Sequence, residues 1–234
     1  MKTIKKLLVA ALAIISLNAT AQTADEIVAK NNKAMGGLEK LKTLSSTKMT
    51  GTMTIQTYEF PVTFSTINGK GMRFDLEVEG TSNYQFYTTE KGSTFFPVEQ
   101  MTEPKEATAD EVKANQRQLD TQGSLVDSKA KGYKIEFISK EIVDSSEAYK
   151  LKITDKNNKE SFYFIDTKTN FLIKTTSKRK NEEGKEVENS NSFADYKQNK
   201  DGFWFAYSIT SINGTFKFDT IDSNVKIDEN IFKN

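Results

Sequence analysis

Apolar and polar residues alternate with a period of two along most of the chain. In the first such run, 49–55, every second residue is a threonine. Strict alternation is typical of antiparallel strands that bury one face and expose the other to solvent. The sequence therefore predicts a mainly β protein. Further runs of the same kind are 60–64, 74–78, 133–137, 149–153 and 203–209.

Turn-forming dipeptides separate these runs. Asn68-Gly69 and Asn213-Gly214 have the composition of tight hairpin turns, because both residue types tolerate a left-handed backbone. Asn157-Asn158 and Asp201-Gly202 mark further turns. The strands are thus expected to follow one another, by short connections, from about residue 49 to residue 232.

A helix precedes the first strand. Thr23 and Glu26 have the spacing of a capping box, in which each side chain accepts a hydrogen bond from a backbone N–H at the start of the helix. Ile27 and Val28 begin an apolar stripe of helical period that returns at 34–35. Gly36-Gly37 is expected to end the helix.

One segment, 103–132, interrupts the strands. Thr108 and Glu111 form a second capping box, and Val112 and Leu119 are the apolar residues of an otherwise polar helix. So thin a stripe predicts a helix at the surface that packs weakly. Such an insertion is either a lid or rim of a binding site or a connector that covers a sheet edge.

The N-terminus has the pattern of a secretory signal peptide. Lys2, Lys5 and Lys6 precede an apolar run of eleven residues, 7–17, which is shorter than the roughly 20 residues of a membrane span. Ala19-Thr20-Ala21 is a small-x-small cleavage site. We therefore predict a signal peptide over 1–21, cleavage before Gln22, and one exported domain over 22–234.

The charge of the mature chain is nearly balanced. Removing the three lysines of the signal leaves 30 basic residues of the original 33, against 32 acidic residues. Both signs are interspersed, which gives no electrostatic reason to expect nucleic acid or an anionic membrane as a partner. The chain has no cysteine for lipidation at the cleavage site. We expect a released monomer that does not span the membrane.

The chain has no histidine and no cysteine. Catalytic triads, Cys-His pairs and zinc sites are therefore excluded, and carboxylate chemistry, Ser-Lys pairs and oxygen-ligand metal sites remain. Glu77 and Glu79 occupy solvent-facing strand positions, and 155–160 lacks the glycine and the bidentate glutamate of a calcium loop. We expect no enzymatic activity, no cofactor and no metal.

Several segments, in order, resemble the periplasmic outer-membrane lipoprotein-carrier family, the LolA-like or lipoprotein-sorting proteins. The similarity begins in the first helix with Ala34-Met35-Gly36-Gly37 and covers nearly the whole mature chain. The other matching segments are 49–53, 68–74, 89–97, 132–135, 148–151, 163–169, 193–197 with Gly202, and 225–228.

The resemblance implies a half-open antiparallel β-barrel, a strongly curved sheet, with an N-terminal helix and an inserted helix as a lid over an apolar cavity. It also implies that the protein works in the periplasm, where it carries or binds lipids, or the acyl chains of lipoproteins, and contacts envelope transport proteins. In the family a strand arginine latches the lid. Aligned on Phe74, that position is Lys70, with Arg73 nearby, so these two residues are the latch candidates.

The chain has 16 phenylalanines and 8 tyrosines, most of them on the apolar side of alternating runs. They either pack a solid core or line a pocket for an apolar ligand. Because the lid helix is thinly apolar, we predict a ligand cavity beneath 110–119. Its predicted lining is Phe60, Val62, Phe64, Phe74, Leu76 and Val78.

Two further functions remain open at this point. A solid core would make the barrel a filled, rigid scaffold or interaction module of the envelope, without a ligand. Two carboxyl groups roughly 5–9 Å apart in a cleft would indicate a carboxylate-only hydrolase.

Overall fold

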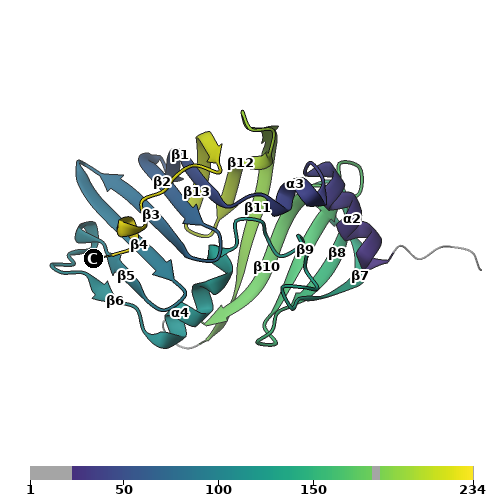
Figure 1. Ribbon diagram of the computed structural model, residues 1–234, viewed down its shortest axis with the longest axis horizontal. Coiled ribbons are helices and arrows are strands. Elements are labelled where there is room, and N and C mark those ends of the chain that lie inside the picture. Colours follow the sequence, from purple (N-terminus) through teal and green to yellow (C-terminus); the bar gives the residue numbers. More distant parts are fainter. Residues whose placement is uncertain (1–22, 181–184, 234) are drawn as a thin grey trace, which may run out of the picture.

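The computed structural model describes residues 23–180 and 185–233, and within them thirteen antiparallel strands form one sheet that does not close on itself (Figure 1). The predicted mainly β, half-open architecture is confirmed. The strands are β1 (Ser46–Ile55), β2 (Tyr58–Ile67), β3 (Gly71–Val78), β4 (Thr81–Thr88), β5 (Gly92–Phe95), β6 (Lys105–Glu106), β7 (Lys134–Val143), β8 (Ser146–Thr154), β9 (Glu160–Asp166), β10 (Leu172–Lys180), β11 (Glu186–Gln198), β12 (Trp204–Ser211) and β13 (Gly214–Ser223).

The strand order places β6 and β7, which are consecutive along the chain, at opposite edges of the sheet. From β1 the chain runs outward to β6, and from β7 it returns inward to β13, which pairs with β1. The connection between β6 and β7 must therefore cross from one edge to the other. It contains α4 (Ala109–Asn115) and the 3₁₀ helix η3 (Gln116–Leu119), and Figure 1 shows α4 in front of the sheet between its two arms.

The N-terminal helix α2 (Ala24–Ala34) and the short α3 (Leu38–Lys42) cover the arm that contains β7, β8 and β9 (Figure 1). The predicted capping box of Thr23 and Glu26 is confirmed. Ile27 is fully buried against Leu151 and Ile165. The helix also buries two polar side chains that the sequence did not single out: the amides of Asn31 and Asn32 donate to backbone carbonyls of the neighbouring loops.

The C-terminal segment with the 3₁₀ helix η4 (Glu229–Phe232) packs on the opposite face of the sheet from α4. Along β3, Met72 packs in the cluster that contains residues of α4 and η3, whereas the ring of Phe232 lies directly over Gly71. Neighbouring residues of a strand point to opposite faces. A further 3₁₀ helix, η2 (Pro97–Glu99), follows β5.

The hairpin turns and the interruption lie where the pattern predicts them. Asn68-Gly69 joins β2 to β3, Asp201-Gly202 lies between β11 and β12, and 155–159 is the turn between β8 and β9. The predicted signal peptide and its cleavage before Gln22 lie outside the described residues. Of the helices in the described ranges, none is long and apolar enough to cross a membrane.

Candidate functional site

The six predicted lining residues lie together on one face of β2 and β3. Strand pairing sets Val62 opposite Leu76 and Phe64 opposite Phe74. The six residues form one apolar cluster, which we call the aromatic cluster, together with Met53 of β1, Phe216 of β13 and Phe96, which follows β5. The ring centroids of Phe64 and Phe74 are 4.7 Å apart, and those of Phe64 and Phe216 are 5.5 Å apart.

This aromatic cluster is buried at its base and accessible above it. Met53, Val62 and Leu76 are buried, whereas Phe60, Phe64, Phe74 and Val78 are half-buried. A single exposed aromatic ring is ordinary on a protein surface, but several that touch one another form a contiguous apolar patch, which is typical of a binding surface. That this surface holds a ligand stays a prediction.

The lid segment, α4 and η3, packs beside the aromatic cluster. Val112 and Leu119 are buried in a second cluster with Met72 of β3 and Tyr87 of β4, and Phe64 borders both clusters. The helix therefore adjoins the six residues through Phe64. These two apolar side chains are those that the sequence predicted for the lid helix.

The N-terminus of α4 is capped as predicted. Glu111 accepts hydrogen bonds from the backbone N–H and the hydroxyl of Thr108, and these bonds hold the pKa of the Glu111 carboxyl below its usual value. The capping box specifies where the helix begins. It does not attach the helix to the sheet.

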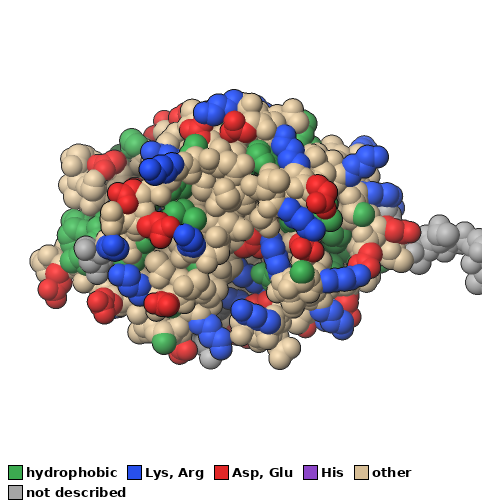
Figure 2. Space-filling model, in the orientation of Figure 1, with side chains coloured by type: hydrophobic (Ala, Val, Ile, Leu, Met, Phe, Trp, Pro, Cys, Tyr) green, Lys and Arg blue, Asp and Glu red, His purple; other side chains and the backbone are tan. Residues whose placement is uncertain are grey.

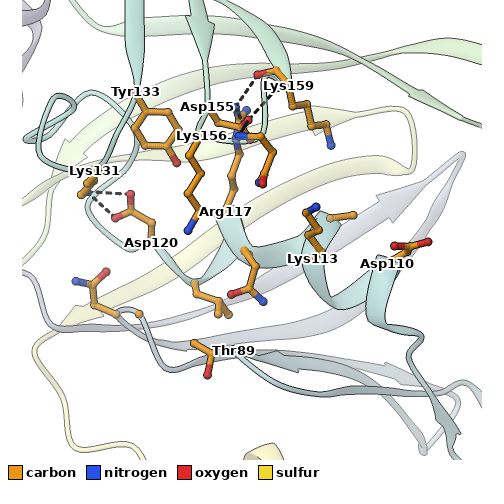
Figure 3. Close-up of a pocket in the computed structure, with 16 residues that line it drawn as sticks. Thr89, Asp110, Lys113, Arg117, Asp120, Lys131, Tyr133, Asp155, Lys156 and Lys159 are labelled. Atoms are coloured by element: carbon orange, nitrogen blue, oxygen red, sulfur yellow. Dashed lines mark hydrogen bonds and ion pairs between the residues drawn. The ribbon is translucent and has the colours of Figure 1, made fainter.

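Arg117 of η3 attaches the lid segment to the other arm of the sheet (Figure 3). Its guanidinium donates to the hydroxyl of Ser161 at 3.1 Å and to the carbonyl of Lys159 at 3.3 Å, and its Nη2 lies 3.3 Å from Oδ2 of Asp155. The Asp155 side chain is only 9% exposed, so the ion pair is shielded from solvent. The lid is thus held to β3 and β4 by apolar contacts and by a hydrogen bond from Gln116 to the carbonyl of Thr88, and to the β8–β9 turn by Arg117.

A second ion pair stabilises the chain that follows η3. Nζ of Lys131 lies 2.8 Å from both carboxylate oxygens of Asp120. Both side chains are largely buried. This pair joins two residues of the same loop, between η3 and β7. The ion pair that connects η3 to the arm with β8 and β9 is that of Arg117.

The two predicted latch residues contact other parts of the protein. Lys70 forms an ion pair with Glu229 of η4 at 2.7 Å. Arg73 donates to Asp75 and to the carbonyl of Ile231, and its guanidinium lies 4.2 Å from the ring centre of Tyr84. These contacts are with the C-terminal segment and the outer face of the sheet, not with α4. A latch role for Lys70 or Arg73 stays a prediction, without a contact that supports it.

A cleft of about 570 Å³ lies between the lid segment and the β8–β9 turn (Figure 3). Its walls are α4, η3, the β2–β3 turn, the 155–159 turn and the chain just before β7. Half of the residues that line it are charged, which the sequence did not predict. The basic residues are Lys113, Arg117, Lys131, Lys156 and Lys159, and the acidic ones are Asp110, Asp120 and Asp155.

A smaller cavity of about 230 Å³ lies beneath α2. Tyr163 and Tyr196 line it, and their hydroxyls donate to Ser124 and to the carbonyl of Leu172, respectively. Burial raises the pKa of both tyrosines. Their hydroxyls therefore stay protonated near neutral pH.

The carboxylates considered for catalysis are exposed, engaged in ion pairs or, like the buried Asp166, held by hydrogen bonds within their own turn. Glu77 and Glu79 are exposed, as their positions predicted. Asp120 and Asp155, which lie in the charged cleft, are each paired with a basic side chain. Among the described residues no three carboxylates come close enough together to hold a metal ion.

Comparison with known proteins identifies the fold. No family model matches the chain, and no curated protein matches it in sequence. A LolA superfamily protein from Nitrosomonas europaea superimposes with a TM-score of 0.55 over 92% of this chain and 99% of its own, at 10% identity. An outer membrane lipoprotein-sorting protein domain from Vibrio parahaemolyticus superimposes with a TM-score of 0.51 over 89% of this chain and 95% of its own, at 15% identity. The chain therefore has the LolA-like fold that its sequence resembles.

Arg117 and Asp155 are the functional candidates that sequence reasoning missed. The chain has three arginines, Arg73, Arg117 and Arg179, and one of them stands in the segment that was predicted to be a lid. An arginine in a polar helix that is predicted to be a lid could have indicated an ion pair between the lid and the sheet. Its partner Asp155 was considered only within the segment 155–160, which was rejected as a calcium loop, and pairing across 38 residues leaves no local pattern.

Proposed function

We propose that the protein is a non-enzymatic carrier or binder of lipids or lipidated proteins in the periplasm, and that an acyl chain lies on the aromatic cluster. The observation that carries the proposal is the accessible apolar patch beside a lid segment that packs through only two buried apolar side chains, Val112 and Leu119. The LolA-like fold supports it by analogy with proteins of the same architecture.

The energetics favour an apolar ligand over an empty surface. Removing each CH₂ of an acyl chain from water contributes about 0.8 kcal/mol. A chain of a dozen carbons that covers the half-buried rings of Phe60, Phe64 and Phe74 would gain on the order of 10 kcal/mol before the entropy of ordering the chain is subtracted. That gain offsets part of the cost of displacing the lid, which is held by the contacts of Val112 and Leu119, by the ion pair of Arg117 and by a few hydrogen bonds.

Placement outside the cytoplasm rests on the predicted signal peptide. The mature chain lacks cysteine, so its stability does not depend on disulfides. A carrier of acyl chains between two membranes needs a compartment that both membranes face, which is what the periplasm provides.

Binding of a fluorescent apolar probe to the purified protein tests the proposal. Phe74→Glu should abolish binding, because it places an unpaired carboxylate against the acyl chain, at a cost of several kcal/mol. Phe74→Leu, which keeps the surface apolar, should retain it. Ile142→Glu is the matched control: it adds the same charge at a residue of β7, at the far edge of the sheet, that is 73% exposed, and should leave binding unchanged.

The alternative is a filled barrel that acts as an envelope scaffold or interaction module without a ligand. Ring-to-ring packing favours it: Phe64 contacts Phe74, Phe216 and Phe218 within 6 Å between centroids. If no apolar probe binds the wild type, while Phe64→Ala and Leu76→Ala each cost about 2–5 kcal/mol of unfolding free energy, as in filled cores, the scaffold function replaces the carrier.

A further inference from the structure

The charged cleft between the lid and the β8–β9 turn has a surplus of positive charge. Five basic and three acidic side chains line its walls. The surplus is local, because the chain as a whole is close to neutral. Figure 2 shows lysine and arginine side chains around the hollow in the lower middle of the face that carries α4.

Ion pairs within the cleft leave three ammonium groups and the carboxylate of Asp110 unpaired, a surplus of two positive charges. Asp120 is paired with Lys131, and Asp155 with Arg117. In the described part of the chain, the side chains of Lys113, Lys156 and Lys159 form no ion pair. Lys113 belongs to α4 and the other two to the opposite wall. Like charges that share one cleft repel one another, and an anion between them relieves the repulsion.

The cleft adjoins the apolar clusters. Leu119 lines it, and the same side chain, which is only 2% exposed, packs with Met72, Tyr87 and Val112 in the cluster that Phe64 borders. Leu119 therefore lies between the charged cleft and this second cluster, which Phe64 joins to the aromatic cluster. A molecule with a charged head and an apolar tail finds complementary surfaces on either side of η3.

We propose that this cleft binds the phosphate head group of an anionic amphiphile whose chain lies on the aromatic cluster. The second half of this statement rests on the proposed carrier function. A phosphate is favoured over a single carboxylate because the cleft's surplus of two positive charges is better balanced by a doubly charged anion than by a singly charged one. Lysine binds phosphate as a flexible point charge and needs no fixed geometry.

The cleft and the carrier function are tested together by two amphiphiles that share a chain. Binding of dodecyl phosphate and of dodecyl maltoside is measured by calorimetry, each below its critical micelle concentration. The wild type should bind dodecyl phosphate at least tenfold more tightly at low salt, and the difference should shrink as ionic strength rises.

The triple variant Lys113→Gln, Lys156→Gln, Lys159→Gln should bind the two amphiphiles equally. The matched control, Lys30→Gln, Lys48→Gln, Lys226→Gln, removes the same charge from exposed residues elsewhere and should keep the preference for phosphate. All six lysines are exposed, and thermal melting verifies that both variants fold.

The outcomes separate the two proposals. If the triple variant keeps the wild-type preference, or if the wild type binds both amphiphiles equally, the phosphate site is wrong and the carrier function stands. If neither amphiphile binds, the carrier function itself fails. Inorganic phosphate should compete only at concentrations at least tenfold above those of dodecyl phosphate; equal potency would show that the cleft takes free phosphate and would overturn a lipid head group.

Discussion

Nη2 of Arg117 lies 3.3 Å from Oδ2 of Asp155, and this ion pair joins the lid segment to the arm of the sheet that the lid does not pack on. Arg117 is in η3, between two stretches of a connection that spans the open side of the sheet. Asp155 also accepts hydrogen bonds from the backbone N–H groups of Asn157 and Lys159, so the turn that carries it is rigid. The ion pair is therefore a defined point at which the lid can be released.

We expect Arg117→Gln to lower the free energy of unfolding by about 1–3 kcal/mol, because it removes charge-assisted hydrogen bonds to a largely buried carboxylate. Hydrogen exchange should accelerate over 109–132 more than in the sheet. Arg117→Lys keeps the charge but loses the planar fork, and should lie between the wild type and Arg117→Gln.

A double-mutant cycle with Asp155→Asn isolates the pair. We expect a coupling energy of about 1 kcal/mol or more, since the two side chains are mostly buried. The pair of Lys129 and Asp25, whose side chains are 79% and 72% exposed, serves as the control and should couple by about 0–0.5 kcal/mol. Equal coupling in both cycles would show that Arg117 does not hold the lid.

Asn199 is predicted to be a structural residue of high sensitivity. Its buried amide donates to the carbonyl of Ile221 and the hydroxyl of Ser223, and its Oδ1 accepts the N–H groups of Asp201 and Phe203. Asn199→Ala should lower the free energy of unfolding by about 2–4 kcal/mol, because buried backbone groups lose their partners.

Denaturant titration measures this loss. Asn230→Ala, at an exposed position, is the control and should stay within about 0.5 kcal/mol of the wild type. A small effect of Asn199→Ala would mean that water replaces the amide.

Stability should fall at alkaline pH, in part through Tyr196. Burial raises the pKa of Tyr196 in the folded protein, so the folded state binds the phenolic proton more tightly than the unfolded state does. The contribution of Tyr196 to the free energy of unfolding is fully present at pH values below the pKa of tyrosine in the unfolded chain, about 10. This contribution is lost as the pH rises above that value.

Tyr196→Phe removes this titration and one hydrogen bond, to the carbonyl of Leu172. At pH 8 the variant should be about 1 kcal/mol less stable than the wild type. The difference should shrink between pH 9 and pH 11, as measured by denaturant unfolding at each pH. A difference that stays constant over this range would contradict the assignment.

Export is predicted to yield a soluble product that starts at or near Gln22. Cell fractionation followed by N-terminal mass spectrometry measures the cleavage. Replacing Ala19 and Ala21 with bulky residues should block processing, because signal peptidase reads small side chains at these two positions. Recovery of the wild type only in detergent, with residues 1–21 retained, would overturn the prediction.

The local pattern predicted six strands, and those six are confirmed as β1, β2, β3, β7, β8 and β12. It did not predict β11 by alternation, because this strand carries polar residues on both faces, as in Asn189-Ser190-Asn191-Ser192. Hydrogen bonds to β10 and β12 hold it in the sheet. Propensity and periodicity describe one strand at a time and do not register such support from neighbours.

The sequence by itself determined the elements whose causes are local. Side-chain period sets the faces of a strand, and two capping boxes set where α2 and α4 begin. The absence of histidine and cysteine excluded whole classes of chemistry without reference to any fold. The apolar residues of the aromatic cluster were also identifiable, because burial of one strand face follows from its composition.

Tertiary structure alone decided which residues meet. The crossing from β6 to β7 exists because these strands lie at opposite edges of the sheet, and that path brings Arg117 to Asp155 and gathers three unpaired lysines into one cleft. The tertiary structure also places Lys70 and Arg73 in contact with the C-terminal segment. Coulombic contacts between distant residues depend on the course of the chain between them, and no local period of the sequence encodes that course.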